Sequence, residues 1–545
     1  MKPTSPSSAP FFPILLFFIT LAAAIIRFAG IDFGLPGTFA RPDEELLISE
    51  GLKFFNEGFQ PQQYNYPAFY KYILHFVFRV YHFLAAHGPG FQFFPMEKYY
   101  FADRCLSAFF GTATVPLLYY IVAGIYGRSA GILSSLFLCF SYLHARDSHF
   151  GTTDIALTFW TVVAYGAAMK IIKKPGSWNY AQAGMAAAFA FTTKYTGIIA
   201  VSPVLAAHWL VKRNCQPFPR DKAGKAKPAT DGFLFVFVPA VLFFSFLSSP
   251  YLFLKAGDVY KDISLLFNAL HVSSSGGNAS IIHHLTFTFY YGLGLPLYIA
   301  AAAGLAYLFS RKKREDWATV AFPSAYLLIM GMAPVKYVRY MLPAIPFFCV
   351  AAGVLWAEAS KKIEKLDPWF FYGLQAALLA GVLLPSARNI LFFDRMALRT
   401  DSRVLASQWI KKNVPRESNI LVHASEGTLD MPYDLDGYNL SWLSKGGDAK
   451  VIPEIKMDRA IIDYIIIAKH SYFADRSIQY ETARFLADII KKRGREVFSL
   501  KPYIFTREKG KAPVYDLSDV FYIPLAPTGL VLYPGPGITI YKIER

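Results

Sequence analysis

The sequence contains few cysteines, which limits the ways in which covalent links or metal ions could hold it together. Four cysteines occur among 545 residues, and none lies after position 349. They show no metal-ligand spacing: Cys105, Cys139, Cys215 and Cys349. A structural disulfide or a zinc site is therefore not expected. No cofactor is predicted, and metal independence is the default, with a divalent metal ion left open.

Charged residues are also scarce, at 17% of the chain against 54% hydrophobic residues. The formal net charge of +17 taken alone would fit a nucleic-acid partner. However, Lys and Arg concentrate in short loops between apolar segments, which is the orientation signal of a membrane protein. Several apolar runs reach the roughly 20 residues that a helix needs to cross a bilayer. The sequence thus predicts a polytopic α-helical membrane protein and no nucleic-acid partner.

About eleven transmembrane helices are predicted within residues 1–389. The predicted spans lie near 11–29, 104–126, 130–147, 154–172, 179–193, 195–211, 232–250, 286–309, 317–333, 340–358 and 369–388. The basic loops between them all fall on one side, which is then the cytoplasm. This register places the N-terminus inside and everything after the last span outside.

Residues 31–103 are predicted to form one large external loop with two helices at the bilayer surface. The first helix begins at Pro42, where the missing backbone N–H costs nothing. It carries Asp43 and Glu44 directly beyond the first span, where acids are expensive unless they face water or a polar cavity. This position suits acid–base chemistry on a lipid headgroup.

The second surface helix is predicted within residues 66–86. Four basic residues recur there at helical spacing and form a stripe opposite an apolar face: Lys71, His75, Arg79 and His82. A helix of this kind lies in the membrane interface. We expect its basic face to point towards the phosphates of lipid headgroups.

The composition changes after residue 388, where the chain becomes charged and mixed. A helix is predicted from Ser402 to Asn413. Short strand-like runs follow at Asn419–Val422, Tyr464–Ala468, Val520–Ile523 and Ile538–Lys542. Alternating helix and strand signals predict a small extracytoplasmic α/β domain over residues 390–545.

Three carboxylates predicted on the external face are candidate catalytic groups: Asp43, Glu44 and Asp154. A carboxylate at such a position can accept the proton of a hydroxyl group. The simpler alternative is that Asp43 and Glu44 favour the positive end of their helix. For Asp154 it is an interfacial ion pair with Arg146.

Cations on the same face are candidates for binding an anion such as phosphate. Arg146, Lys336 and Arg339 would supply the positive charge, together with Lys71 of the basic stripe. Lys336 and Arg339 could instead simply snorkel at a helix end. The common location of acids and cations on one side of the membrane favours a functional site.

The chain resembles the GT-C superfamily of membrane glycosyltransferases, and within it the protein O-mannosyltransferase-like family that includes the lipid A aminoarabinose transferases. The resemblance covers most of the membrane region. It rests on Arg41-Pro42-Asp43-Glu44, Tyr64-Asn65-Tyr66-Pro67, Arg146 to Asp154, Thr193-Lys194-Tyr195, Arg339-Tyr340 with Pro343 and Pro346, and Asp401-Ser402-Arg403. Each motif is loose, whereas their order and sidedness together are fairly specific.

The resemblance implies transfer of a sugar from a polyprenyl-phosphate donor to an acceptor on the outer face of the membrane, with inversion expected. Asp43 would be the general base, and Asp154, the second acid, would orient the acceptor or an arginine. Tyr66 and Tyr340 lie in the matching motifs and are candidate substrate-binding residues. The acceptor would be a lipid, a glycan or a protein, and the location a bacterial or archaeal plasma membrane.

A second class of function is a transporter or flippase of lipid-linked sugars. Transporters usually have related halves and acids near the middle of the membrane. This sequence shows no related halves, and its acids lie at the outer interface. An enzyme is therefore favoured over a transporter, and the external domain gives little support to a third reading as a receptor or assembly protein.

Overall fold

The computed structural model describes most of the membrane region and about half of the C-terminal region. The described residues are 11–35, 41–85, 94–214, 232–273, 280–333, 336–363, 365–424, 435–443, 462–469, 481–502, 514–516, 523–526 and 531–544. The predicted strand at Val520–Ile523 lies outside the described residues except for Ile523.

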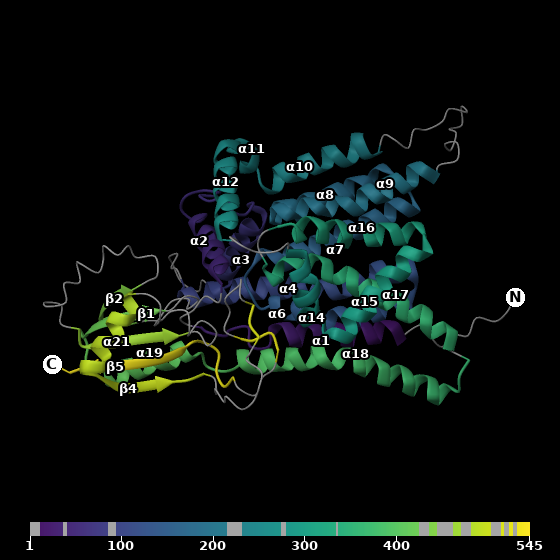
Figure 1. The fold of residues 1–545 in the computed structure, drawn as a ribbon. Helices are drawn as coiled ribbons and strands as arrows, with labels where there is room; N and C mark the ends of the chain where they lie inside the picture. The colour runs from purple at the N-terminus through teal and green to yellow at the C-terminus, as the bar shows by residue number, and fades with distance from the viewer. Residues whose placement is uncertain are drawn as a thin grey trace. The chain divides into compact units, whose positions relative to one another are not determined.

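The chain divides into two compact units. The first comprises Met1–Phe28, Asp43–Phe94 and Tyr99–Ile390, and the second comprises Ala29–Pro42, Pro95–Lys98 and Leu391–Arg545. The first unit is helical, and the second holds the only β-sheet among the described residues. The helices and strands of both are labelled in Figure 1.

The helical unit begins with one long apolar helix, two shorter helices and a second long helix. Its helices up to residue 214 are α1 (Phe11–Phe28), α2 (Pro42–Lys53), α3 (Phe69–Ala85), α4 (Met96–Tyr126), α5 (Arg128–Cys139), α6 (Tyr142–Asp147), α7 (Thr153–Lys173), α8 (Ser177–Thr193), the 3-10 helix η1 (Tyr195–Val201) and α9 (Ser202–Asn214). The first residues of α4 belong to the second unit.

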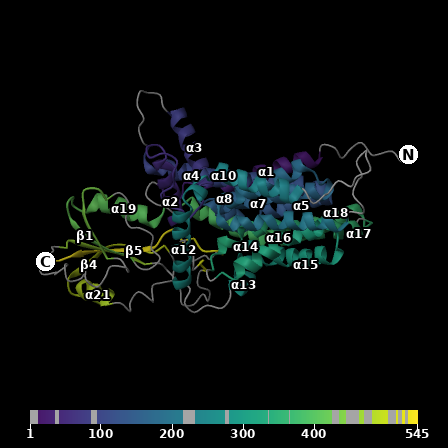
Figure 2. The same cartoon turned by 90° about the horizontal axis from the view of Figure 1, so that it is seen from above.

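The remaining helices of this unit are often short or interrupted. They are η2 (Phe233–Phe237), α10 (Val238–Ser248), α11 (Tyr251–Leu254), α12 (Ala256–Ser273), α13 (Ser280–His283), η3 (His284–Thr288), α14 (Phe289–Leu293), α15 (Leu295–Arg311), α16 (Arg314–Gly331), η4 (Val338–Ala344), α17 (Ile345–Ile363) and α18 (Pro368–Ala397). Figure 2 shows many of them from above.

Six helical segments of the described chain are long and apolar enough to cross a membrane, or seven if one bent pair counts as a single span. The predicted number of about eleven is therefore not confirmed. One reason is that predicted spans contain breaks. The predicted span 286–309 bends by 119° between Leu293 and Leu295, where Gly294 adopts a φ of 77° that favours glycine. The apolar helices nevertheless make this chain an integral membrane protein.

Small residues allow the central helices to approach closely, as is common in membrane helix packing. A side chain at Gly304 of α15 would lie 2.2 Å from the backbone oxygen of Ala351 in α17. Gly184 of α8 makes a similar approach to Ala240 of α10, where an added Cβ would lie 2.7 Å from the alanine methyl group. Figure 1 shows α8 running beside α10, and α8 also packs against α7.

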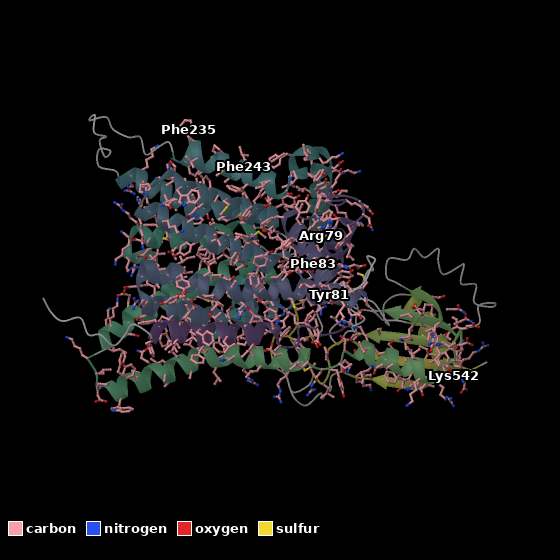
Figure 3. The ribbon with its side chains drawn as sticks, turned by 180° about the vertical axis from the view of Figure 1, so that it is seen from behind. Arg79, Tyr81, Phe83, Phe235, Phe243 and Lys542 are labelled. Carbon is pink, nitrogen blue, oxygen red and sulfur yellow. The ribbon has the colours of Figure 1, made fainter. Side chains whose placement is uncertain are left out.

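Helix α3 turns three of the four residues of its basic stripe inward, so the predicted outward orientation of the stripe is wrong. Lys71 and His75 are buried, whereas Phe76 and Phe83 are 65% and 81% exposed. Arg79 is the stripe residue that is exposed, and it lies with Phe83 on the outer side of the helix in Figure 3. The helical spacing of the basic residues is as predicted. However, Glu50 and the backbone of Gly51 in α2 bind Lys71 and His75, so the apolar side of α3 faces outward.

The second unit contains a five-stranded mixed sheet with the order β2-β1-β3-β5-β4. Its strands are β1 (Asn419–Ala424), β2 (Asn439–Leu443), β3 (Tyr464–Lys469), β4 (Gly494–Leu500) and β5 (Gly537–Ile543). The first three are parallel, and β5 pairs antiparallel with both β3 and β4. Three of these strands coincide with predicted ones, whereas β2 and β4 were not predicted.

One helix covers each face of this sheet, as the alternation of side chains along a strand requires. Helix α19 (Ser402–Asn413) packs Ile410 against Ile420 and Val422 of β1. Helix α21 (Glu481–Arg493) packs Leu486 against Leu421, which points to the opposite face. Figure 2 shows α19 and α21 on the two sides of the strands. The unit is thus an α/β sandwich, and its extracytoplasmic location stays a prediction.

Candidate functional site

The first turn of α2 holds two adjacent acids whose side chains enter different surroundings. Successive residues of a helix point about 100° apart. Glu44 is fully buried, and Arg104 donates two hydrogen bonds to it, from Nε at 2.9 Å and Nη2 at 3.0 Å. The backbone N–H of Gly151 donates a third at 2.9 Å. Glu44 therefore anchors the start of α2 to α4 and to the loop before α7.

Asp43 lies in a second, more open network. Its Oδ2 is 2.8 Å from Nη2 of Arg339, and 20% of its side chain is exposed. Nε of the same arginine lies 4.0 Å from Oδ2 of Asp154, whose side chain is only 3% exposed. Asp154 also accepts a hydrogen bond of 2.7 Å from Nζ of Lys194. The four charges alternate in the order Asp43, Arg339, Asp154 and Lys194, which we call the charge row.

The charge row is assembled from four separate parts of the sequence. Asp43 comes from the first turn of α2, and Asp154 from the first turn of α7. Lys194 follows the last residue of α8 and precedes η1, while Arg339 lies in η4. Each carboxylate of the row thus begins a helix, where the helix dipole favours negative charge.

Three tyrosine rings surround the charge row. The Nζ of Lys194 lies 4.8 Å from the ring centroid of Tyr340 and 5.7 Å from that of Tyr66. The guanidinium carbon of Arg339 lies 4.9 Å from the ring centroid of Tyr337. Cation–π contacts at these distances are attractive and hold the cations in place.

Tyr66 stays protonated at physiological pH. Burial raises the pKa of its hydroxyl well above 10, and the nearby carboxylate of Asp43 raises it further. The positive charge of Arg339 opposes the increase without cancelling it. A neutral phenol can donate one hydrogen bond and accept another, which suits the binding of a sugar or a phosphate oxygen.

Lys71 belongs to a different cluster. Its Nζ donates to the backbone oxygen of Gln63 at 2.6 Å and lies 3.4 Å from Oε2 of Glu50. Glu50 also accepts a hydrogen bond from the backbone of Gln62 at 3.0 Å. These contacts tie α3 to α2 and to the loop between them. Lys71 is fully buried, so the structure gives no support to its predicted contact with phosphate.

Two other predicted cations lie apart from the charge row in the contacts that the structure describes. Arg146 is buried, 3.4 Å from Oδ2 of Asp147, with its guanidinium 5.7 Å from the ring centroid of Phe150. It is not the ion-pair partner of Asp154 that the simpler interpretation assumed, since Asp154 pairs with Lys194 and Arg339. Lys336 is half-buried, and its positive charge lies beside His283.

The structure therefore brings together five of the nine predicted site residues. They are Asp43, Asp154, Arg339, Tyr66 and Tyr340. The charge of Lys194 was missed, although its motif was recognised. A signal was present, because Lys194 is the only acidic or basic residue, histidine aside, between Pro175 and Val211. A lone ionisable residue in such an apolar stretch is a functional candidate by default.

Metal ligands do not gather in the described part of the chain. No three His, Cys, Asp or Glu side chains among the described residues are placed so that they could hold a metal ion. Within the charge row, each carboxylate has a cation as its neighbour. Lys194 and Arg339 contribute positive charge to this site.

One protein-family model matches part of the chain. Residues 66–251 match the family model described as dolichyl-phosphate-mannose-protein mannosyltransferase. This match includes Tyr66, Asp154 and Lys194 but not Asp43 or Arg339. A comparison with curated protein sequences gives no significant match.

Solved structures with a similar fold cover nearly the whole chain. The archaeal oligosaccharyltransferase AglB from Archaeoglobus fulgidus, in complex with an inhibitory peptide and a dolichol-phosphate, superposes with a TM-score of 0.52 at 12% identity, covering 93% of this chain and 75% of that one. ArnT from Cupriavidus metallidurans in the apo state gives 0.50 at 14% identity, covering 87% and 96%. The chain therefore shares the fold of these glycosyltransferase structures, and its residues 66–251 resemble the dolichyl-phosphate-mannose-protein mannosyltransferase family.

Proposed function

We propose that this protein is a glycosyltransferase that moves a sugar from a polyprenyl-phosphate donor to a hydroxyl group of an acceptor. The observation that carries the proposal is the charge row, in which a partly open carboxylate lies beside two cations and three tyrosines. The family description names a lipid-phosphate-linked sugar, and the AglB structure contains a dolichol-phosphate. Both support a donor of this chemical class.

Asp43 is the proposed general base. Of the two carboxylates in the row it is the accessible one, with 20% of its side chain exposed against 3% for Asp154. Arg339 at 2.8 Å fixes its direction and stabilises its negative charge. Much of the rate must therefore come from the positioning of the reactants and from stabilisation of the leaving phosphate.

The reaction keeps the charge of the site constant. The acceptor hydroxyl gives its proton to Asp43, its oxygen attacks the anomeric carbon, and the bond from that carbon to the phosphate oxygen breaks. The leaving polyprenyl phosphate gains one negative charge while Asp43 loses one. Direct displacement of this kind inverts the anomeric carbon.

Arg339 and Lys194 are the proposed ligands of the phosphate. A guanidinium group presents several N–H donors in one plane and binds phosphate oxygens well. Asp154 holds both cations, through the 2.7 Å hydrogen bond to Lys194 and the 4.0 Å approach to Arg339. It is thus a positioning residue in this proposal, as is Glu44 through its anchor to Arg104. The proposal assigns no metal ion or cofactor.

The acceptor is a lipid, a glycan or a protein. The proposed active site faces the extracytoplasmic side of a plasma membrane, because the basic loops of the sequence define the opposite side as cytoplasmic. On this register the α/β unit lies on the same side as the charge row.

The test is transfer by the purified protein from a defined polyprenyl-phosphate sugar, with Asp43→Asn compared with Glu45→Gln. Glu45 lies in the same helical turn and is exposed, so its substitution is a matched control. Loss of a general base lowers the rate by roughly 10²- to 10⁴-fold, whereas the control should keep the wild-type rate. Transfer by Asp43→Asn at the wild-type rate would refute the proposed base. Movement of donor lipid across vesicles without any transfer would favour the transporter.

A further inference from the structure

A cleft of about 450 Å³ lies between the end of α4, the end of α7 and the first half of α8. We call it the α4–α7–α8 cleft. Asp154 stands in the first turn of α7, whereas the cleft begins at its last turns. The 16 residues from Asp154 to Lys170 correspond to roughly 24 Å along the helix. The cleft is therefore near the opposite face of the membrane from the charge row.

The wall of the cleft is apolar. Leu117 and Ile121 of α4, Val163 of α7 and Met185 of α8 contribute to it. Both α4 and α7 are long and apolar enough to cross the membrane, so the hydrocarbon chains of lipids are the natural neighbours of this wall. The volume falls in the range of roughly 300–1,000 Å³ that is common for small-molecule sites.

Two lysines lie at the end of the cleft nearest the helix termini. Nζ of Lys170 donates to Oε1 of Gln182 at 3.3 Å, and Nζ of Lys173 donates to the backbone oxygen of Gly124. Both lysines are exposed, and neither forms a salt bridge with a carboxylate of the described residues. A cation at the C-terminal end of a helix is stabilised by the helix dipole, which explains the contact of Lys173 with the backbone oxygen of Gly124. The helix dipole does not explain the open apolar cleft beside the two lysines.

We propose that the α4–α7–α8 cleft binds one anionic phospholipid of the bilayer. Its acyl chain would lie along the apolar wall, and its phosphate would contact Lys170 and Lys173. Basic pockets between membrane helices on the cytoplasmic side are suited to such headgroups. A zwitterionic lipid would bring its own cation next to the two lysines, so an anionic lipid fits better. This site is independent of the proposed sugar transfer.

Native mass spectrometry of the purified protein with phosphatidylglycerol or phosphatidylcholine tests the proposal. The wild type should retain one phosphatidylglycerol in preference to phosphatidylcholine. The double variant Lys170→Gln/Lys173→Gln should bind it about 25-fold more weakly, from a factor of about five for each lysine near the surface. Lys361→Gln/Lys362→Gln is the matched control, because it removes two lysines from the last turn of α17 outside the cleft.

A second variant tests the apolar part of the cleft without changing charge. A Cβ atom added at Gly124 would meet no heavy atom within 4 Å, so we expect the ring of Gly124→Phe to extend into the cleft. We expect it to abolish the retained phosphatidylglycerol while the fold is kept. Equal retention of phosphatidylglycerol by both variants and the wild type would overturn the proposal. So would equal retention of phosphatidylcholine and phosphatidylglycerol by the wild type.

Discussion

Replacement of Glu44 by glutamine should destabilise the helical unit by about 3–5 kcal/mol, the usual effect of removing one partner of a buried ion pair. Both side chains of the Glu44–Arg104 pair are 0% exposed. Two charge-assisted hydrogen bonds join them, and the backbone of Gly151 donates a third bond to the same carboxylate. Glutamine has only one acceptor oxygen, so the NH2 of its amide group would face an N–H group of Arg104 and leave that donor without an acceptor.

Thermal unfolding in detergent, followed with a thiol-reactive fluorophore, would measure this effect. Cys139 and Cys349 are buried free thiols that become reactive only when the helices separate. The midpoint for Glu44→Gln should fall by several degrees, and that for Glu45→Gln should stay near the wild type, because Glu45 is exposed. The double variant Glu44→Gln/Arg104→Gln should lose less stability than the sum of the two single variants.

Two results would refute this reasoning. If Glu44→Gln unfolds within about 1 kcal/mol of the wild type, the pair contributes no more than an exposed salt bridge does. If the effects of the two single variants simply add, Glu44 and Arg104 do not act on each other. An additional fall in transfer rate for the folded Glu44→Gln protein is expected, since the anchor sets the direction of the neighbouring Asp43.

Three further predictions concern the charge row. Arg339→Lys should lower kcat/KM by about 10- to 150-fold, because one ammonium group cannot contact both Asp43 and Asp154 as the guanidinium does. This range corresponds to the loss of one hydrogen bond to a charged group, which contributes about 1.5–3 kcal/mol. Wild-type kinetics for this variant would contradict the proposed role of Arg339. Lys194→Met should raise KM for the donor, with partial rescue by Lys194→Arg, whereas an unchanged KM in steady-state kinetics would exclude phosphate binding by this residue. The pKa of Tyr66 is raised in the folded state, so its neutral phenol contributes to the free energy of unfolding. This contribution is complete below pH 10 and is lost as the pH rises from 10 through the raised pKa. Tyr66→Phe should therefore remove that alkaline loss of stability in unfolding measured from pH 8 to 11, and an identical loss in the variant would count against it.

The sequence predicted three residues of the charge row but did not indicate which of them lie next to one another. Asp43, Asp154 and Arg339 were predicted from their positions next to apolar segments, and the structure places them in one row. Glu44 could not be separated from Asp43 by pattern alone, because its partner Arg104 is 60 positions away. Contacts between distant segments depend on helix packing, which a single sequence does not specify.

Helix α3 shows a second limit of the pattern. Periodicity divides a helix into two faces, but it does not say which face the protein covers. A helix with a basic stripe and an apolar face is typical of the membrane interface, so the stripe was expected to point towards the phosphates of lipid headgroups. Glu50 and the backbone of α2 reverse this expectation by binding Lys71 and His75 inside. The sequence pattern likewise does not reveal the break at Gly294, which divides the predicted span 286–309.

The distribution of charge along α7 has a consequence for the biosynthesis of this protein. The segment leaves the ribosome with Asp154 first and with Lys170, Lys173 and Lys174 at its trailing end. Lysines that flank an apolar segment are retained on the cytoplasmic side during insertion, so in the proposed orientation Asp154 is the residue that is carried across. The translocation step that orients α7 thus also delivers the carboxylate on which Arg339 and Lys194 later assemble. An inverted α7 could not be repaired by later folding, because the charge row would then be divided between two compartments.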